Sequence, residues 1–307
     1  MRPTIAIATG DPAGIGPEIA LKAALDLRVI SVCRPLLVGD PAVVQSHARR
    51  AGLSTELNVI DMPGEATWST GAVNLLNAGD GSNRPLKFGT VDAAYGRASL
   101  TSARRAIQAA LAGDVDAVVA APQTERSVVA AGITFDGYPS FVARETGTPV
   151  ENVYLMICFD DARIVHATLH LSVRQAVRVI TQEHVERVIR VTDASLKKLG
   201  ILRPKIFVSG LNPHAGEEGM FGSEEVDIII PAIAQAAKED IEVSGPFGAD
   251  TMFLKKGSDA FIVMLHDQGH IAAKLLAFNR TAGLSIGSPI LFSSVAHGSA
   301  HDIAGKG

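Results

Sequence analysis

The sequence of 307 residues lacks most of the features that mark specialised protein classes. It has two cysteines, Cys33 and Cys158, and both lie in apolar stretches, so no disulfide framework is expected. No segment approaches the roughly 18 apolar residues of a membrane span, and the first apolar run ends at Gly10, too early for a secretory signal. Lysine and arginine total 28 against 32 aspartate and glutamate, without a basic run. We therefore expect a soluble, cytoplasmic protein that binds neither nucleic acid nor membrane.

The sequence also lacks a complete GxGxxG motif. Gly14-Ile15-Gly16 resembles its beginning, but no third glycine follows at the required spacing, so a Rossmann fingerprint is not predicted. Gly10, Asp11 and Gly14 lie in the first strand-to-helix turn, where their backbone could approach a ligand. The same residues also suit a plain tight turn in which Asp11 caps the helix beginning near Gly16.

Short apolar runs alternate with helical patterns along most of the chain. Predicted strands are 4–9, 35–38, 57–60, 115–120, 153–158, 163–170, 205–209 and 260–265. Predicted helices are 17–27, 42–51, 91–112, 183–199 and 223–238. This alternation predicts an α/β fold with a largely parallel sheet covered on both faces. Residues 63–89 have little periodicity and predict a long loop, and no linker separates two halves of the chain.

Three histidines lie where predicted strands end. They are His170, His214 and His266, and open α/β sheets place their ligands beyond the carboxyl ends of strands. Three neutral imidazoles suit Zn²⁺, Co²⁺ or similar ions and leave positions open for a substrate oxygen. Their spacing carries no local signature, and each could instead hydrogen-bond a loop carbonyl. Asp250 offers either a further metal ligand or an N-cap for the segment that follows it.

Four longer stretches carry a family resemblance. They are GDPAGIGPEIALKA (10–23), SGLNPHAGE (209–217), GPFGADTMF (245–253) and LHDQGHIAAKLL (265–276). Together they resemble the 4-hydroxythreonine-4-phosphate dehydrogenase family of pyridoxal phosphate biosynthesis, and the resemblance runs from about residue 4 to the end.

The resemblance implies an architecture. It is an isocitrate/isopropylmalate dehydrogenase-like α/β/α sandwich whose two subdomains share a mixed, largely parallel sheet. Residues 1–125 plus 255–307 are expected to form the cofactor-binding subdomain, and residues 126–254 the substrate, metal and dimerisation subdomain. A homodimer with its active site at the subunit interface is implied as well.

The resemblance also assigns roles near the metal. It implies one divalent ion (zinc, cobalt, magnesium or manganese) held by His170, His214 and His266, with Asp250 and Lys274 as catalytic residues. Arg174, four residues after His170, could bind a substrate carboxylate or could be a solvated arginine at a helix start.

The last eleven residues, HGSAHDIAGKG, resemble the adenosine-binding loop of the isopropylmalate dehydrogenase superfamily. The resemblance places His297, Gly298 and Ala300 against adenine, and Asp302 on the ribose hydroxyls. A carboxylate accepts from a 2′-hydroxyl and repels a 2′-phosphate, so NAD is expected over NADP. A glycine-rich turn capped by Asp302 is the other interpretation.

The residues that bind substrate in the family are replaced here. The phosphate-binding asparagine and arginine fall on Gly283 and Phe292, and a His-Thr pair falls on Tyr138-Pro139. The family's lysine falls on Glu125. Phosphate recognition needs an arginine fork, a lysine or several N–H donors, so a 4-phosphate substrate is not favoured.

The stretches GYPS, RIVHATLH and GSAHDIAGKG look closer to a branch that oxidises terephthalate cis-dihydrodiols. We expect a metal- and NAD-dependent dehydrogenase that oxidises a secondary alcohol to a β-keto acid and decarboxylates it. Its expected substrate is a small non-phosphorylated hydroxy acid, for example a cis-dihydrodiol carboxylate. The alternatives are a true 4-hydroxythreonine-4-phosphate dehydrogenase and, in another class, a metal-dependent hydrolase.

Overall fold

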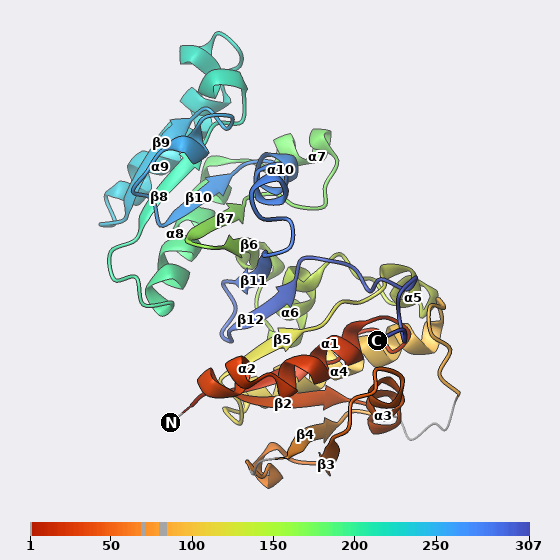
Figure 1. The fold of residues 1–307 in the computed structure, drawn as a ribbon. Coiled ribbons are helices and arrows are strands. Elements are labelled where there is room, and N and C mark those ends of the chain that lie inside the picture. Colours follow the sequence, from red (N-terminus) through yellow and green to blue (C-terminus); the bar gives the residue numbers. More distant parts are fainter. Residues whose placement is uncertain (1, 69–70, 80–84) are drawn as a thin grey trace. The chain divides into compact units, whose positions relative to one another are not determined.

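The computed structural model shown in Figure 1 describes residues 2–68, 71–79 and 85–307. The chain divides into two compact units, unit 1 (Met1–Thr146 and Pro289–Gly307) and unit 2 (Gly147–Ser288). The division expected from sequence falls instead after residues 125 and 254. Within the described ranges, no helix has the length and apolar character to cross a membrane.

Unit 1 contains a sheet of parallel strands. In sheet order these are β3 (Glu56–Ile60), β4 (Ala72–Asn77), β2 (Arg34–Gly39), β1 (Thr4–Ala8), β5 (Ala117–Ala120) and β12 (Phe292–Val295). The chain leaves β1 toward β2 on one side and later adds β5 on the other. The carboxyl ends of β1 and β5 therefore meet at a topological switch point, where open α/β sheets bind their ligands.

Helices cover both faces of this sheet. They are α1 (Gly16–Leu25), α2 (Leu27–Val32), α3 (Pro41–Arg50), α4 (Ala93–Leu111), α5 (Glu125–Ala130) and α6 (Tyr138–Thr146), with the short 3₁₀ turn η1 (Pro63–Glu65). Leu36 packs toward α4 in one cluster, whereas its neighbour Leu37 packs toward α1 and α3 in another. Burial of alternate residues on opposite faces explains why β2 carries an unbroken apolar run over Pro35–Val38.

Unit 2 contains a mixed sheet. In sheet order its strands are β11 (Ala282–Ile286), β6 (Tyr154–Phe159), β7 (Ala162–His166), β10 (Ala260–Val263), β8 (Lys205–Ser209) and β9 (Glu242–Phe247). The pairs β11–β6 and β6–β7 are antiparallel, and the pairs β7–β10, β10–β8 and β8–β9 are parallel. Four neighbouring strands thus present their carboxyl ends at one edge.

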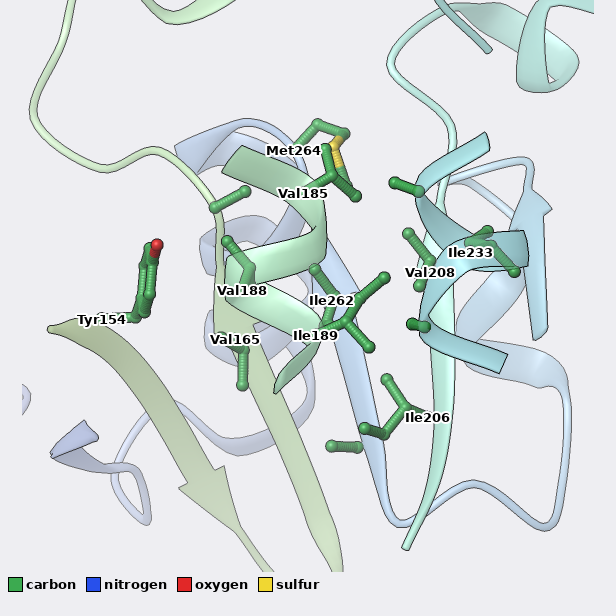
Figure 2. Packing of buried hydrophobic residues seen from close by; sticks show 14 of the residues in the cluster. Tyr154, Val165, Val185, Val188, Ile189, Ile206, Val208, Ile233, Ile262 and Met264 are labelled. Atoms are coloured by element: carbon green, nitrogen blue, oxygen red, sulfur yellow. The ribbon is translucent and has the colours of Figure 1, made fainter. Parts of the chain in front are cut away.

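The helical segments of unit 2 lie around this sheet. They are η2 (Val150–Asn152), α7 (Val173–Val179), α8 (Gln182–Lys198), η3 (Pro213–Gly219), the π turn η4 (Glu225–Ile229), α9 (Ile230–Ala237), η5 (Met252–Leu254) and α10 (His266–Ala277). Figure 2 shows the core on one face, where Val188 and Ile189 of α8 meet Ile206 and Ile262 of the sheet. On the other face, Ala273 and Ala277 of α10 pack with Val263 and Phe261.

The expected class, an α/β fold with a mixed, largely parallel sheet, is confirmed. The predicted loop over 63–89 needs correction, because it contains β4, which is buried on both faces and so shows no alternation. Residues 69–70 and 80–84 of that prediction lie outside the described residues. The predicted helix over 223–238 is divided into η4 and α9, and Pro231, which has no N–H, stands at the division.

The predicted strand over 163–170 also needs correction, because β7 ends at His166. Beyond it, the Thr168 hydroxyl donates to the carbonyl of Met264 (2.7 Å), and the chain leaves the ladder toward His170.

Candidate functional site

The candidate metal ligands of unit 2 follow four neighbouring parallel strands. His170 follows β7, His266 follows β10 as the first residue of α10, His214 follows β8, and Asp250 follows β9. Because β10 lies between β7 and β8 in the sheet, ligands far apart in the sequence share one edge. His170, His214 and Asp250 are exposed and His266 is half-buried, so all four can reach a ligand from solvent.

Three other histidines lie close to His266. Its ring centroid lies 5.8 Å from that of His170 and 3.8 Å from that of His270, onto which it stacks. His166, only 1% exposed, packs 4.6 Å from His270. Burial, followed by the neighbouring His270 ring, lowers the pKa of His166 to about 3, and burial lowers the pKa of His270 to about 4. Both rings are therefore uncharged at neutral pH and add no positive charge of their own to this region.

The loop that carries His214 has an unusual backbone. Residues 214–218 all have positive φ, with values of 53° at His214 and 54° at Ala215. A left-handed conformation costs about 1–2 kcal/mol for each residue other than glycine. Contacts from outside the loop must therefore hold it.

Glu225 supplies such contacts. Its Oε1 accepts from the backbone N–H groups of Leu211 and Asn212, both at 2.7 Å, and its Oε2 accepts from Asn212 Nδ2 at 2.9 Å. Hydrogen bonds to a carboxylate are the strong ones among those in proteins. Sequence reasoning missed Glu225, because a glutamate eleven residues beyond the motif histidine has no signature of its own.

Two more residues tie the candidate ligands to their surroundings. Gln268 accepts at Oε1 from the N–H groups of Met264 and Leu265, both at 2.9 Å, and donates from Nε2 to the Gly210 carbonyl at 3.1 Å. It therefore joins the start of α10 to the loop after β8. Gly248 lies beside Asp250 and His214, since a Cβ there would stand 2.8 Å from Asp250 Oδ1 and 3.8 Å from the His214 Cα.

The donor set of three imidazoles and a carboxylate suits a divalent d-block ion. Within the part of the chain that the structure describes, no three His, Cys, Asp or Glu side chains converge on one point. The His170 and His266 rings are neighbours, and the backbone of His214 and the Asp250 carboxylate both lie close to Gly248. Lys274 is exposed two turns along α10, and Arg174 is exposed in the first turn of α7.

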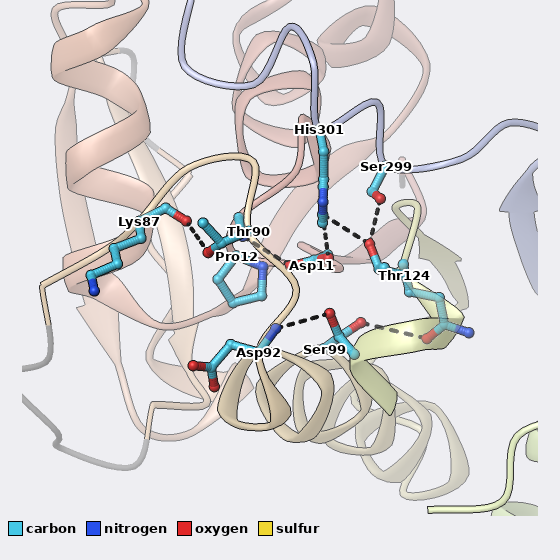
Figure 3. A network of polar contacts seen from close by, with 12 residues as sticks. Asp11, Pro12, Lys87, Thr90, Asp92, Ser99, Thr124, Ser299 and His301 are labelled. Atoms are coloured by element: carbon cyan, nitrogen blue, oxygen red, sulfur yellow. Dashed lines mark hydrogen bonds and ion pairs between the residues drawn. The ribbon is translucent and has the colours of Figure 1, made fainter. Parts of the chain in front are cut away.

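A polar network occupies the switch point of unit 1, as Figure 3 shows. Asp11, fully buried, accepts at Oδ1 from the N–H of Ala13 (2.9 Å) and lies through Oδ2 at 2.9 Å from His301 Nε2. The same nitrogen lies 3.0 Å from Thr124 Oγ1, and Thr124 also hydrogen-bonds Ser299. Because a carboxylate only accepts, His301 Nε2 carries the proton.

This network attaches the C-terminal loop to the first turn of the chain. Ser299 accepts at its carbonyl from the N–H of Ile15 (2.9 Å), and a Cβ on Gly14 would stand 2.6 Å from the Ser299 Cβ. Gly14 is thus required for close approach of the two segments. His301, Thr124 and Ser299 were missed from the sequence, although the repeated histidine in HGSAHD was a visible signal.

The predicted cofactor residues lie around this network. His297 and Gly298 are exposed, and the His297 ring bonds the Gly298 carbonyl (2.9 Å). Ala300 has a φ of 44°, and Asp302 is exposed. An exposed carboxylate on a loop held by buried contacts is available to ribose hydroxyls.

The predicted substrate residues differ in their surroundings. Phe292 is fully buried, 5.1 Å from the ring of Tyr138, whose hydroxyl donates to the Ala121 carbonyl at 3.1 Å. Burial raises the pKa of Tyr138, which stays protonated. Gly283 is buried in β11, paired with Ile157 of β6.

Comparison with known proteins identifies the class. Two α/β units with histidines at strand ends match solved dehydrogenases over nearly their whole length. One is the 4-hydroxythreonine-4-phosphate dehydrogenase from Klebsiella pneumoniae, with TM-score 0.89 and 35% identity, covering 99% of this chain and 94% of that chain. Another is a terephthalate 1,2-cis-dihydrodiol dehydrogenase from Burkholderia xenovorans LB400, with TM-score 0.71 and 40% identity. The match covers 99% of this chain and 93% of that chain.

The family follows from the sequence comparison. Residues 31–307 match the family described as pyridoxal phosphate biosynthetic protein PdxA, and the chain belongs to that family. It is 42% identical over 309 residues to a proposed D-threonate 4-phosphate dehydrogenase from Symbiobacterium thermophilum, covering 100% of this chain and 92% of that protein. The resemblance drawn from the sequence motifs is confirmed, and the chain is an oxidoreductase of the dehydrogenase type.

Proposed function

We propose that this protein is a metal- and NAD-dependent dehydrogenase that oxidises a secondary alcohol of a non-phosphorylated hydroxy acid. The substrate class is a cis-dihydrodiol carboxylate or a similar hydroxy acid, and the resulting β-keto acid loses CO₂. The observation that carries the proposal is the burial of Phe292 and Gly283, at the two positions where the family binds phosphate. Neither residue offers a side-chain donor, and Phe292 is packed against Tyr138.

The metal would be held by His170, His214 and His266, with Asp250 beside His214. When bound, a divalent ion lowers the pKa of the alcohol and stabilises the negative charge that develops as CO₂ leaves. The low pKa values of His166 and His270, set first by burial, keep these two rings neutral, so neither adds a positive charge beside a bound metal.

The chain's own residues would bind and move the remaining groups. Arg174, exposed in the first turn of α7, would pair with a substrate carboxylate. Lys274 is the candidate for proton transfer with the alcohol, and Asp250 is the alternative. NAD, when bound, supplies the hydride acceptor, and Asp302 would accept from its ribose and disfavour a 2′-phosphate.

The proposal includes a homodimer. Leu275 in α10 and Phe278 just beyond it are exposed large apolar side chains of unit 2. Burying them against a second copy of the chain would remove them from water, which supports the dimer expected from the family.

An activity screen tests the substrate class. The protein, supplied with Zn²⁺, Co²⁺, Mg²⁺ or Mn²⁺, is offered NAD or NADP with each of three substrates: terephthalate cis-dihydrodiol, D-threonate 4-phosphate and 4-phosphohydroxy-L-threonine. Reduction of NAD with the dihydrodiol and release of CO₂ is the expected result. Turnover confined to either phosphorylated compound would overturn the proposed substrate.

A further inference from the structure

We propose that Glu225 is a positioning residue that fixes the backbone of the His214 loop (residues 210–219), from which His214 would reach a metal ion. The metal role rests on the proposed function, whereas the hold on the loop stands on contacts within unit 2. The hydrogen bonds of Glu225 go to Leu211 and Asn212, so it would act on His214 through the loop backbone.

The first observation is the burial and full use of the carboxylate. Glu225 is only 1% exposed, and each of its oxygens accepts at least one hydrogen bond. Two of the three donors are consecutive backbone N–H groups, at Leu211 and Asn212, directly after the end of β8. A buried carboxylate is costly unless it is bonded in this way. The loop and the carboxylate therefore depend on each other.

The second observation is that the loop closes around the carboxylate at two glycines. A Cβ on Gly216 would stand 2.5 Å from Glu225 Oε2, and a Cβ on Gly210 would stand 2.9 Å from Oε1. Gly216 also has a φ of 79°, which favours glycine on backbone grounds. The chain thus approaches the carboxylate on both sides of His214.

The third observation is the conformation of the segment between those glycines. His214 and Ala215 lie in the left-handed region, as do Glu217 and Glu218 beyond Gly216. Such a run is unfavourable for L-residues, so the loop relaxes to other conformations unless it is held. A loop free to relax would present the His214 ring in many orientations. High metal affinity requires that the ring be held in a single orientation.

The fourth observation is how Glu225 is itself anchored. It is the first residue of the π turn η4, whose last residue, Ile229, is fully buried in the core with Val208 of β8. Single π turns are rare and recur at functional sites. The turn connects the carboxylate rigidly to the strand that leads into the loop.

The experiment compares Glu225→Gln and Glu225→Ala with the wild type and with Asp227→Asn. Asp227 is exposed in the same π turn, so its variant controls for charge in this region. The dissociation constant of Co²⁺ is measured by titration of the metal-free protein, followed by the visible absorption of the bound ion. Removing a partner that orients a metal ligand weakens affinity by about 10–100-fold, and that loss is expected for Glu225→Ala. Wild-type affinity in Glu225→Ala would overturn the proposal.

The Glu225→Gln variant distinguishes a loss of loop positioning from a loss of folding. It keeps an oxygen for Leu211 and Asn212 but turns an amide N–H toward the side-chain amide of Asn212. We expect an intermediate affinity with an unchanged far-ultraviolet circular dichroism spectrum. Should Glu225→Ala fail to fold, the glutamine variant decides, and wild-type Co²⁺ affinity in it would count against the positioning role.

A readout without metal distinguishes this proposal from the proposed function. If the wild type binds no Co²⁺ or Zn²⁺, the metal part of the proposed function fails. Hydrogen exchange of the Leu211 and Asn212 amides in metal-free protein then tests the hold on the loop. We expect both amides to exchange at least about tenfold faster in either Glu225 variant. The alanine variant removes their acceptor, and the glutamine variant replaces the carboxylate oxygen by a weaker acceptor. Unchanged exchange would overturn it.

Discussion

Gln268 donates its side-chain amide to the carbonyl of Gly210, 3.1 Å away, across 58 residues of sequence. The same side chain accepts from two N–H groups just before His266. One glutamine thus fixes the position of the start of α10 relative to the loop after β8. It thereby fixes the backbone of His266 relative to the loop that carries His214. Positioning by backbone contacts of this kind is what keeps a metal site to a narrow geometry.

Replacing Gln268 by glutamate should weaken metal binding by about tenfold, because the acceptor for Met264 and Leu265 remains while the donor to Gly210 is lost. Titration with Co²⁺ measures the change. The matched control is Gln182→Glu, at the start of α8, where the same chemical change should leave Co²⁺ affinity as in the wild type. Equal affinity in Gln268→Glu and the wild type would show that the two loops hold their places independently.

Replacing His301 by leucine should raise the dissociation constant for NAD about tenfold, equivalent to roughly 1.4 kcal/mol. The substitution removes the bonds to Asp11 and Thr124 that attach the C-terminal loop. Fluorescence titration or thermal shift with NAD measures it. His214→Ala is the reciprocal control: it should abolish Co²⁺ binding and activity while NAD binding persists. An unaltered NAD affinity in His301→Leu would show that the contacts of His301 with Asp11 and Thr124 are not needed for the cofactor site.

Stability should fall as the pH drops from 7 to 5, in part through His47. Burial lowers the pKa of His47 below its usual 6.5, against the opposing effect of its bond to the Pro12 carbonyl (2.8 Å). Below pH 6.5 the unfolded chain therefore takes up a proton that the folded chain refuses, so the free energy of unfolding decreases as pH falls. His47→Gln keeps a donor for Pro12 and should show a shallower slope in urea unfolding at pH 5, 6 and 7. A slope as steep as that of the wild type would assign the loss of stability to other groups.

Replacing Phe292 by arginine should destabilise unit 1 without creating a phosphate site. The ring is fully buried beside Tyr138, and an unpaired charge there costs about 3–5 kcal/mol. Urea unfolding measures the loss, with Phe292→Leu as a milder apolar control. A stable Phe292→Arg protein that gains turnover of a 4-phosphate substrate would show instead that this position opens to the substrate.

Local patterns in the sequence were enough for much of the fold. The strand over 205–209 coincides with β8, because a run such as Lys205–Ser209 is bounded by proline and glycine and carries its own β preference. Strand β9 was not predicted from the sequence, because Gly245 and Pro246 interrupt its apolar residues. Helix α10 was not predicted either, because its sequence begins with polar residues and has a glycine at position 269.

The sequence by itself determined the family and the kinds of side chain available, because motifs are contiguous and chemistry is carried by residue type. Only the tertiary structure decided which of them meet. The order β7–β10–β8–β9 results from long-range strand pairing. It places the carboxyl ends of these four strands at one edge of the sheet, and the candidate ligands follow those ends: His170, His266, His214 and Asp250. The bond between Asp11 and His301 spans 290 residues, and the carboxylate of Glu225 reaches back around the His214 loop. Such contacts depend on burial and hydrogen-bond satisfaction in the folded chain, which no local pattern records.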